Sequence, residues 1–390
     1  MVLMHSENRT NVRLLAIKKL SFMAFLVASS YGAFATAWPI LLKEIIIDRA
    51  KIGFFTAGLS MLGMIFLISL VPLIHKFKPK QLYFISLIST SILFLLHVYV
   101  NNVYTFLIVA ILNMFFMTVQ IQCFGILIRD HSSLKNINQN ENLIFILGNF
   151  GWLIGPLASS WIVSHYGVDL VFVMASLFLL MGTHLFAFTK TTEHKSTEEK
   201  LNIFKNLITF IKKKKLRKIY FLNAGLEIWW CLPFIFVPLE ILREGYASKY
   251  IGLFLFSVIV PLILTELLLK KMSKKFSEKV LLICGYSILA LSTCACFFAN
   301  NIIQIALFVI AGSFGLALIE FNVESLFFKT IKKLEGEKFY GPFTTAKTAG
   351  SFIGKLGIAF CLSFFTFKYI FVFMFFVMIS LMTLATQIKK

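Results

Sequence analysis

Glu227, Glu320, Glu324 and Lys355 lie deep inside long apolar stretches of the sequence, where a charged side chain costs about 2.5–3.5 kcal/mol. Glu320 and Glu324 are four residues apart and therefore share one face of a helix. Two carboxylates so close in a low dielectric disfavour double ionisation, which suits such a pair to carry a proton. Glu227 and Lys355 lie about 14 Å and 20 Å inside their stretches at 1.5 Å per residue. These four residues are the predicted proton-coupling or substrate-binding residues.

A structural role for the same charges is the alternative. Lys355 or Lys347 could neutralise one of the carboxylates and form an ion pair that fixes the packing of two helices. Glu266, one turn from the end of its apolar stretch, is expected to act in gating or packing.

Uncharged polar and aromatic residues in the same stretches could line a cavity. Gln120 and Gln122 point in different directions on a helix, so at most one of them faces it. The two tryptophans beside Glu227 could stack on an aromatic or cationic substrate, or simply pack, since 16% of the chain is aromatic. The predicted cavity-lining residues are Tyr31, Asn113, Gln120, Asn149, Trp152, Trp229 and Trp230. No catalytic or metal-ligating constellation stands out, and the six cysteines match neither a disulfide framework nor a zinc site.

Twelve apolar stretches of about 20 residues, long enough to cross a bilayer as helices, must position these side chains. They lie at 20–41, 53–74, 82–100, 104–128, 143–164, 168–188, 219–241, 250–269, 280–299, 302–328, 342–364 and 369–387. With 58% hydrophobic and only 14% charged residues, the chain has too little polar surface for a water-soluble globule of 390 residues. The composition therefore predicts a multi-pass membrane protein.

The basic residues predict its orientation. Most of the 38 Lys and Arg residues lie in the N-terminus, the C-terminus and alternate loops, and such loops stay cytoplasmic. The opposite loops hold Lys43, Arg49, Lys51, Arg243, Lys249 and Lys368. We therefore expect a cell-membrane protein with both termini in the cytoplasm. Contact of the basic loops with anionic lipid accounts for the net charge of +20, so no nucleic-acid partner is expected.

The chain divides at its only long polar interval. We expect a cytoplasmic N-terminus at 1–19, a six-helix bundle at 20–188 and a cytoplasmic linker with an amphipathic helix at 189–218. A second six-helix bundle at 219–387 and a cytoplasmic tail at 388–390 complete the chain. The sequence Gly151-Trp-Leu-Ile-Gly155-Pro-Leu in the fifth stretch returns 199 residues later as Gly350-Ser-Phe-Ile-Gly354-Lys-Leu in the eleventh. The repeat favours an origin of the two halves by duplication, which is common in secondary transporters.

In this organisation the chain resembles the major facilitator superfamily. The fifth-helix motif is similar to that of the drug-antiporter branch: Gly151, Gly155 and Pro156 are present, and Ser159 and Ser160 replace later glycines. The loops after the second and eighth stretches lack the family's aspartate, and the fourth stretch lacks its arginine. The resemblance implies an all-α integral membrane protein with 12 transmembrane helices in two pseudo-symmetric six-helix bundles. It assigns the fifth-helix residues, with Gly350 and Gly354, to gating or packing.

The function that the resemblance implies is that of a secondary active transporter, not an enzyme. It would move a small molecule across the cytoplasmic membrane by alternating access, with proton coupling and efflux as finer expectations. Uptake of a metabolite by a permease of the same fold is the alternative, and a lipid-modifying membrane enzyme or a receptor belongs to other classes. The expected partners are a small-molecule substrate, protons and the lipid bilayer. No cofactor is expected, and we expect a monomer.

Overall fold

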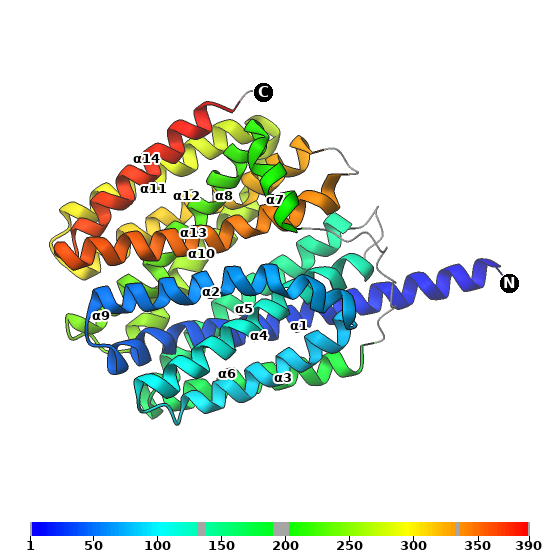
Figure 1. Cartoon of the computed structure of the whole chain (residues 1–390), viewed down its shortest axis with the longest axis horizontal. Helices are drawn as coiled ribbons and strands as arrows, with labels where there is room; N and C mark the ends of the chain where they lie inside the picture. Colours follow the sequence, from blue (N-terminus) through cyan, green and yellow to red (C-terminus); the bar gives the residue numbers. More distant parts are fainter. Residues whose placement is uncertain (1, 132–136, 190–202, 332–334, 389–390) are drawn as a thin grey trace. The chain divides into compact units, whose positions relative to one another are not determined.

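The computed structural model describes residues 2–131, 137–189, 203–331 and 335–388. Within these ranges the chain is helical, with short connections and no strand (Figure 1). The helices are α1 (Val2–Ile45), α2 (Arg49–Lys76), α3 (Pro79–His97), α4 (Val103–His131), α5 (Ile137–Tyr166), α6 (Asp169–Ala187), α7 (Ile203–Lys212), α8 (Lys214–Cys231), η1 (Leu232–Phe236), α9 (Val237–Arg243), α10 (Lys249–Lys275), α11 (Glu278–Phe298), α12 (Ile302–Thr330), α13 (Gly336–Phe364) and α14 (Tyr369–Thr386).

Each of the twelve predicted stretches falls on a helix, and α8, η1 and α9 together cover the seventh. Among the described residues, ten helices are long and apolar enough to cross a membrane. The apolar part of α10, Lys249–Thr265, is shorter, and α13 does not reach the same hydropathy. Lys347 and Lys355 lie within α13, so the helix that carries candidate site residues is also one of the less apolar ones.

The seventh stretch is interrupted by a π-helical turn. Residues Leu232–Phe236 form η1 between α8 and α9, with Pro233 inside it and Pro238 two residues after its end. Proline lacks a backbone N–H and cannot make the usual helical hydrogen bond, so it favours an irregular turn at such a place. Single π-helical turns occur frequently at functional sites.

The chain forms two compact units. The first comprises Met1–Ala37 and Ser69–Glu199, and the second comprises Trp38–Ile68 and Lys200–Lys390. Within the second unit α11 packs on α12 and α14, and α8 packs on α13. The end of α1 and most of α2 thus belong to the second unit by their contacts, although they precede the central interval. The two six-helix bundles at 20–188 and 219–387 stay a prediction from the sequence.

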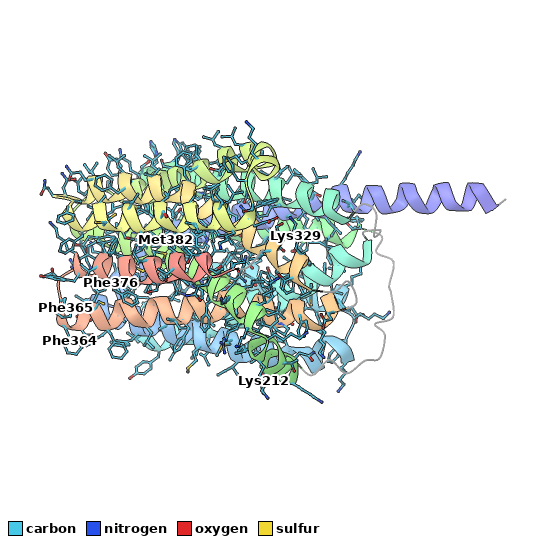
Figure 2. All side chains as sticks on the ribbon, turned by 90° about the horizontal axis from the view of Figure 1, so that it is seen from above. Lys212, Lys329, Phe364, Phe365, Phe376 and Met382 are labelled. Atoms are coloured by element: carbon cyan, nitrogen blue, oxygen red, sulfur yellow. The ribbon has the colours of Figure 1, made fainter. Side chains whose placement is uncertain are left out.

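The second unit has basic and aromatic residues at different ends. Lys212 lies at the end of α7 and Lys329 in the last turn of α12, whereas Phe364 and Phe365 lie at the far end of α13 (Figure 2). In α7, Phe210 is fully buried while Ile208 and Ile211 are exposed, so this helix has one face against the unit and one open apolar face.

Glycines on α5 allow close contact with α1 in the first unit. A Cβ atom on Gly151 would lie 2.4 Å from the carbonyl oxygen of Phe25, and one on Gly155 would lie 2.3 Å from that of Ser29. No other residue type fits at such distances without a shift of the backbone. Pro156, next in the chain, is buried and its ring packs on Gly32.

Glycines on α13 make the equivalent contact with α8 in the second unit. A Cβ on Gly350 would lie 2.1 Å from the carbonyl oxygen of Ala224, and one on Gly354 would lie 2.9 Å from the Cα of Ile228. Each of these four residues lies 199 positions after its counterpart in the α1–α5 contact. The repeat seen in the sequence is therefore also a repeat of one helix–helix contact, which supports duplication.

Gly155→Ala and Gly350→Ala should each lower the thermal stability of the protein. The added Cβ would collide with the backbone of Ser29 or Ala224, and overpacking of this kind costs about 1–3 kcal/mol. Gly148→Ala in α5 is the control, because a Cβ there meets nothing within 4 Å. The melting temperature of the purified protein in detergent is the measurement. Equal melting temperatures for all three variants would contradict the close contacts.

Candidate functional site

Four of the ionisable residues singled out by the sequence form one electrostatic cluster in the second unit. The Nζ atom of Lys347 on α13 lies 3.8 Å from Oε1 of Glu320 on α12. Lys347 also interacts electrostatically with Glu324 on α12 and Glu227 on α8. Of the two lysines that could neutralise Glu320, the structure therefore places Lys347 against it.

Helix α13 presents the polar side of this cluster. Tyr340, Thr344, Lys347, Ser351 and Lys355 recur at spacings of three or four residues, so they form one stripe along the helix. All five are at least partly exposed. The exposed apolar residues of the same helix lie on a different face: Ile353, Phe360 and Phe364. A helix with this division presents one face to polar surroundings and another to apolar ones.

Contacts between α8 and α13 hold Glu227 beside the stripe. The amide of Asn223 donates to the carbonyl oxygen of Phe343 at 3.0 Å, and the thiol of Cys231 donates to the carbonyl oxygen of Ser351 at 3.7 Å. Glu227 lies between Asn223 and Cys231 on the same face of α8. The glycine contact described above brings the two backbones close enough for these bonds.

Two carboxylates of the cluster have no close hydrogen-bond or ion-pair partner in the described part of the chain. Glu227 is half-buried and Glu324 is exposed, and neither makes a hydrogen bond or an ion pair within 4 Å. Their oxygens are not among the buried unpaired atoms, so they lie at an accessible surface of the second unit. They are available to a proton, to water or to a substrate.

Lys355 has hydroxyl partners instead of carboxylates. Its Nζ atom donates to Oγ of Ser60 on α2 at 2.8 Å, and that Oγ lies 3.2 Å from Oγ of Ser351. Helix α2 lies close to α13 at Gly53. A Cβ atom at this position would lie 2.7 Å from the Cβ of Ala359. The sequence alone did not identify Ser60, because nothing in it showed that α2 lies against α13.

Comparison with known proteins identifies the family. Residues 20–247, more than half of the chain, match the family model of the Major Facilitator Superfamily. The chain belongs to the Major Facilitator Superfamily. Two crystal structures of the nucleoside transporter NupG, one of them of a mutant, have the same fold, with TM-scores of 0.77 and 0.76. They are 13% and 12% identical, and each alignment covers 96% of this chain and 100% of the other. No curated protein sequence matches the chain.

The predicted fold class is therefore confirmed: the protein is an all-α, multi-pass membrane protein with the Major Facilitator Superfamily fold. It is a transporter of a small molecule, not an enzyme. In this superfamily member the charged cluster lies on α8, α12 and α13, all of which come from the second half of the sequence.

Two of the predicted cavity residues, Gln120 and Asn113, lie in the interior of the first unit. Tyr31 donates to Oε1 of Gln120, whose amide nitrogen donates to Oγ1 of Thr90 at 2.7 Å and to the carbonyl oxygen of Ser86 at 3.0 Å. Gln120 and Asn113 are 3% and 4% exposed. Both are packed between helices of this unit, and their expected place at a cavity stays a prediction.

The remaining predicted cavity residues differ in how far their side chains are buried. Asn149 and Trp152 on α5 are half-buried, as is Trp230, which stacks on Phe234 with 4.9 Å between ring centroids. Trp229 is fully buried. Its ring would lie 2.5 Å from a Cβ on Gly312, so it packs against α12, and its expected place at a cavity stays a prediction. Glu266 lies in α10 at a position whose side chain is outside the described part of the structure.

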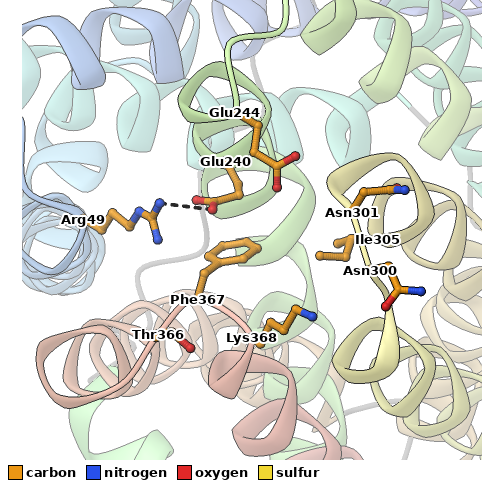
Figure 3. A pocket seen from close by; sticks show the side chains of 9 residues that line it. All are labelled: Arg49, Glu240, Glu244, Asn300, Asn301, Ile305, Thr366, Phe367 and Lys368. Atoms are coloured by element: carbon orange, nitrogen blue, oxygen red, sulfur yellow. Dashed lines mark hydrogen bonds and ion pairs between the residues drawn. The ribbon is translucent and has the colours of Figure 1, made fainter.

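A pocket that the sequence did not indicate lies at one end of the second unit (Figure 3). It has a volume of about 250 Å³. Its lining residues come from the start of α2, the end of α9 and the connections α11–α12 and α13–α14: Arg49, Glu240, Glu244, Asn300, Asn301, Ile305, Thr366, Phe367 and Lys368. These segments belong to the side that the charge pattern predicts to face away from the cytoplasm.

An ion pair between α2 and α9 closes one wall of this pocket. Nη2 of Arg49 lies 3.1 Å from Oε1 of Glu240, and the guanidinium lies 5.8 Å from the centre of the Phe367 ring. The Glu240 side chain is 10% exposed, and its Oε2 has no partner among the described residues. Two further bonds join α9 to the segment before α2: Lys43 at the end of α1 donates to the carbonyl oxygen of Leu242 at 2.7 Å, and Arg243 donates to that of Ile47. From the sequence, Arg49 was identified only as a basic residue of a connecting loop.

Arg49→Met should destabilise the protein by about 1–3 kcal/mol, because it leaves the nearly buried Glu240 carboxylate without its cation. The double variant with Glu240→Gln should regain part of that loss, since it removes the charge that was left unpaired. The free energies of unfolding of the wild type, Arg49→Met, Glu240→Gln and the double variant, measured in one detergent, give the coupling energy of the two side chains. A double variant no more stable than Arg49→Met would show that the two side chains are not coupled.

Proposed function

We propose that the protein is a secondary active transporter that works by alternating access in the cytoplasmic membrane and is coupled to protons. The observation that carries the proposal is the set of carboxylates around Lys347, of which Glu227 and Glu324 have no hydrogen bond and no ion pair within 4 Å among the described residues. Unpaired carboxylates within membrane-spanning helices are costly unless they take up a proton or bind a cation. They are the groups on which a proton can be carried.

The charges of the cluster do not balance without an additional positive charge. Glu227, Glu320 and Glu324 are three carboxylates around one ammonium group, that of Lys347. Protons on the carboxylates that lack an ion pair reduce the excess. Because Lys347 pairs with Glu320 and interacts with both other glutamates, protonation of one carboxylate changes the partners available to this lysine. The accessible surface on which the cluster lies supports exchange of that proton with water.

The direction that we propose is export, on the basis of Gly151, Gly155 and Pro156, the part of the drug-antiporter motif that the chain retains. The second candidate is uptake of a metabolite. It is favoured by the fold shared with the nucleoside transporter NupG. Nucleosides therefore belong in a substrate panel together with amphipathic cations and organic acids, first compared by their effect on the melting temperature.

Proton coupling is tested by flux in proteoliposomes that contain a pH-sensitive dye. A compound that raises the melting temperature should move protons when it is added, and an imposed pH gradient should drive its transport. Glu227→Gln and Glu324→Gln should each abolish the dependence on the gradient, because an amide cannot take up the proton. Glu278→Gln is the control, since this carboxylate pairs with Lys329 outside the cluster.

Flux that is unchanged when the gradient is collapsed, or unchanged in the two cluster variants, would remove proton coupling. The sign of the gradient that drives accumulation separates the two directions. Accumulation inside the liposome under an inward proton gradient identifies symport. Accumulation inside under an outward proton gradient identifies exchange.

A further inference from the structure

Lys355 and Lys347 lie on the same face of α13 but have different partners. Lys347 has the carboxylate of Glu320 at 3.8 Å, whereas no carboxylate lies within 4 Å of Lys355 in the described residues. The ammonium group of a lysine has three N–H donors. Ser60 accepts one of them, and no described side chain or carbonyl accepts the others.

Two hydroxyl groups lie next to this ammonium group. Oγ of Ser60 accepts from Lys355 and lies 3.2 Å from Oγ of Ser351. Because the Ser60 oxygen is engaged by the lysine, its own proton is directed elsewhere, toward Ser351 or the Thr56 carbonyl oxygen at 3.2 Å. When Ser60 donates to Ser351, the proton of Ser351 is free to donate in turn. The arrangement therefore offers donors, which is what an anionic ligand requires.

The internal repeat shows that the fold does not need these charges. Lys355 lies 199 positions after Pro156, and Lys347 lies 199 positions after Gly148. The flanking glycine contacts are the same in both repeats, yet the first repeat places no charge at either position. The glycine contact alone therefore does not account for Lys347 and Lys355.

The ammonium group of Lys355 lies on the polar stripe of α13 and not on its exposed apolar face. Lys355 is half-buried, and it reaches across to Ser60 on α2, whose backbone is held near α13 at Gly53. An ammonium group in surroundings of low dielectric attracts an anion more strongly than one in water. A ligand in contact with the stripe would meet this cation.

We propose that Lys355, assisted by Ser60 and Ser351, binds the carboxylate group of the transported substrate, and that the substrate is therefore a small organic acid. The inference rests on the proposed function, since it assigns a substrate class to the same transport site. A singly charged carboxylate matches the single charge of Lys355. A doubly charged phosphate would leave excess negative charge close to Glu227, which already interacts with Lys355.

The test compares carboxylates with their uncharged amides. Full-length protein in detergent is titrated with lactate, benzoate, nicotinate and phenylacetate, each beside its primary amide, and with inorganic phosphate. The measured quantity is the concentration that gives half of the maximal rise in melting temperature. In the wild type at least one acid should raise the melting temperature at a concentration where its amide does not.

Lys355→Met should weaken the effective acid about 10-fold to 100-fold, the loss expected for a hydrogen bond to a charged group, and should leave any amide binding unchanged. Lys355→Arg keeps the charge and should retain part of the preference for the acid over its amide. Such a result would show that the loss in Lys355→Met is not a folding defect. Lys338→Met is the matched control, because Lys338 is an exposed lysine near the start of the same helix.

The proposal is overturned if no acid stabilises the wild type, if amides act as well as acids, if phosphate acts best, or if the preference survives Lys355→Met. These outcomes are separate from those of the flux assay. Gradient-driven flux without a carboxylate preference leaves the proposed transporter standing and removes the substrate class. A carboxylate preference without gradient-driven flux removes proton coupling and leaves the binding site.

Discussion

The close approach of α13 to α8 is the contact on which the arrangement of charges in the second unit depends. At Gly350 and Gly354 the two backbones lie so near that a Cβ has no room. Small residues are the usual means by which membrane helices pack, because lipid offers no hydrophobic driving force between apolar surfaces. The contact fixes the rotation of both helices, so the stripe with Lys347 and Lys355 comes to lie beside Glu227.

The repeat explains why one half of the sequence carries the charges. The same glycine contact is present between α1 and α5, so the scaffold is the same in both halves. In the first half the position equivalent to Glu227 is Ala28, which packs directly on Gly151. Duplication supplied the scaffold twice, and the ionisable chemistry was placed on one copy. The first unit instead has a neutral hydrogen-bonded interior around Gln120.

Sequence reasoning succeeded where the signal was local. The apolar stretches fell on helices because spanning length and hydropathy are properties of contiguous residues. The pairing of Lys347 with Glu320 was among the stated alternatives because both lie at depth in apolar stretches. The sequence did not reveal Ser60 as a partner of Lys355, nor Glu240 as a partner of Arg49, since these residues are 295 and 191 positions apart. The full burial of Trp229 was not predictable either, because helical spacing alone does not tell a core tryptophan from one at a cavity.

One face of α2 connects features that the sequence places far apart. Arg49, Gly53 and Ser60 follow one another at spacings of four and seven residues and therefore lie on the same side of the helix. Through these residues α2 reaches Glu240 at one end, Ala359 in the middle and Lys355 at the other. The distance from Arg49 to Ser60 is about 16 Å at 1.5 Å per residue. Ligand binding at Lys355 and the Arg49–Glu240 ion pair thus both act on the position of α2, the first through its contact with α13 and the second through its contact with α9.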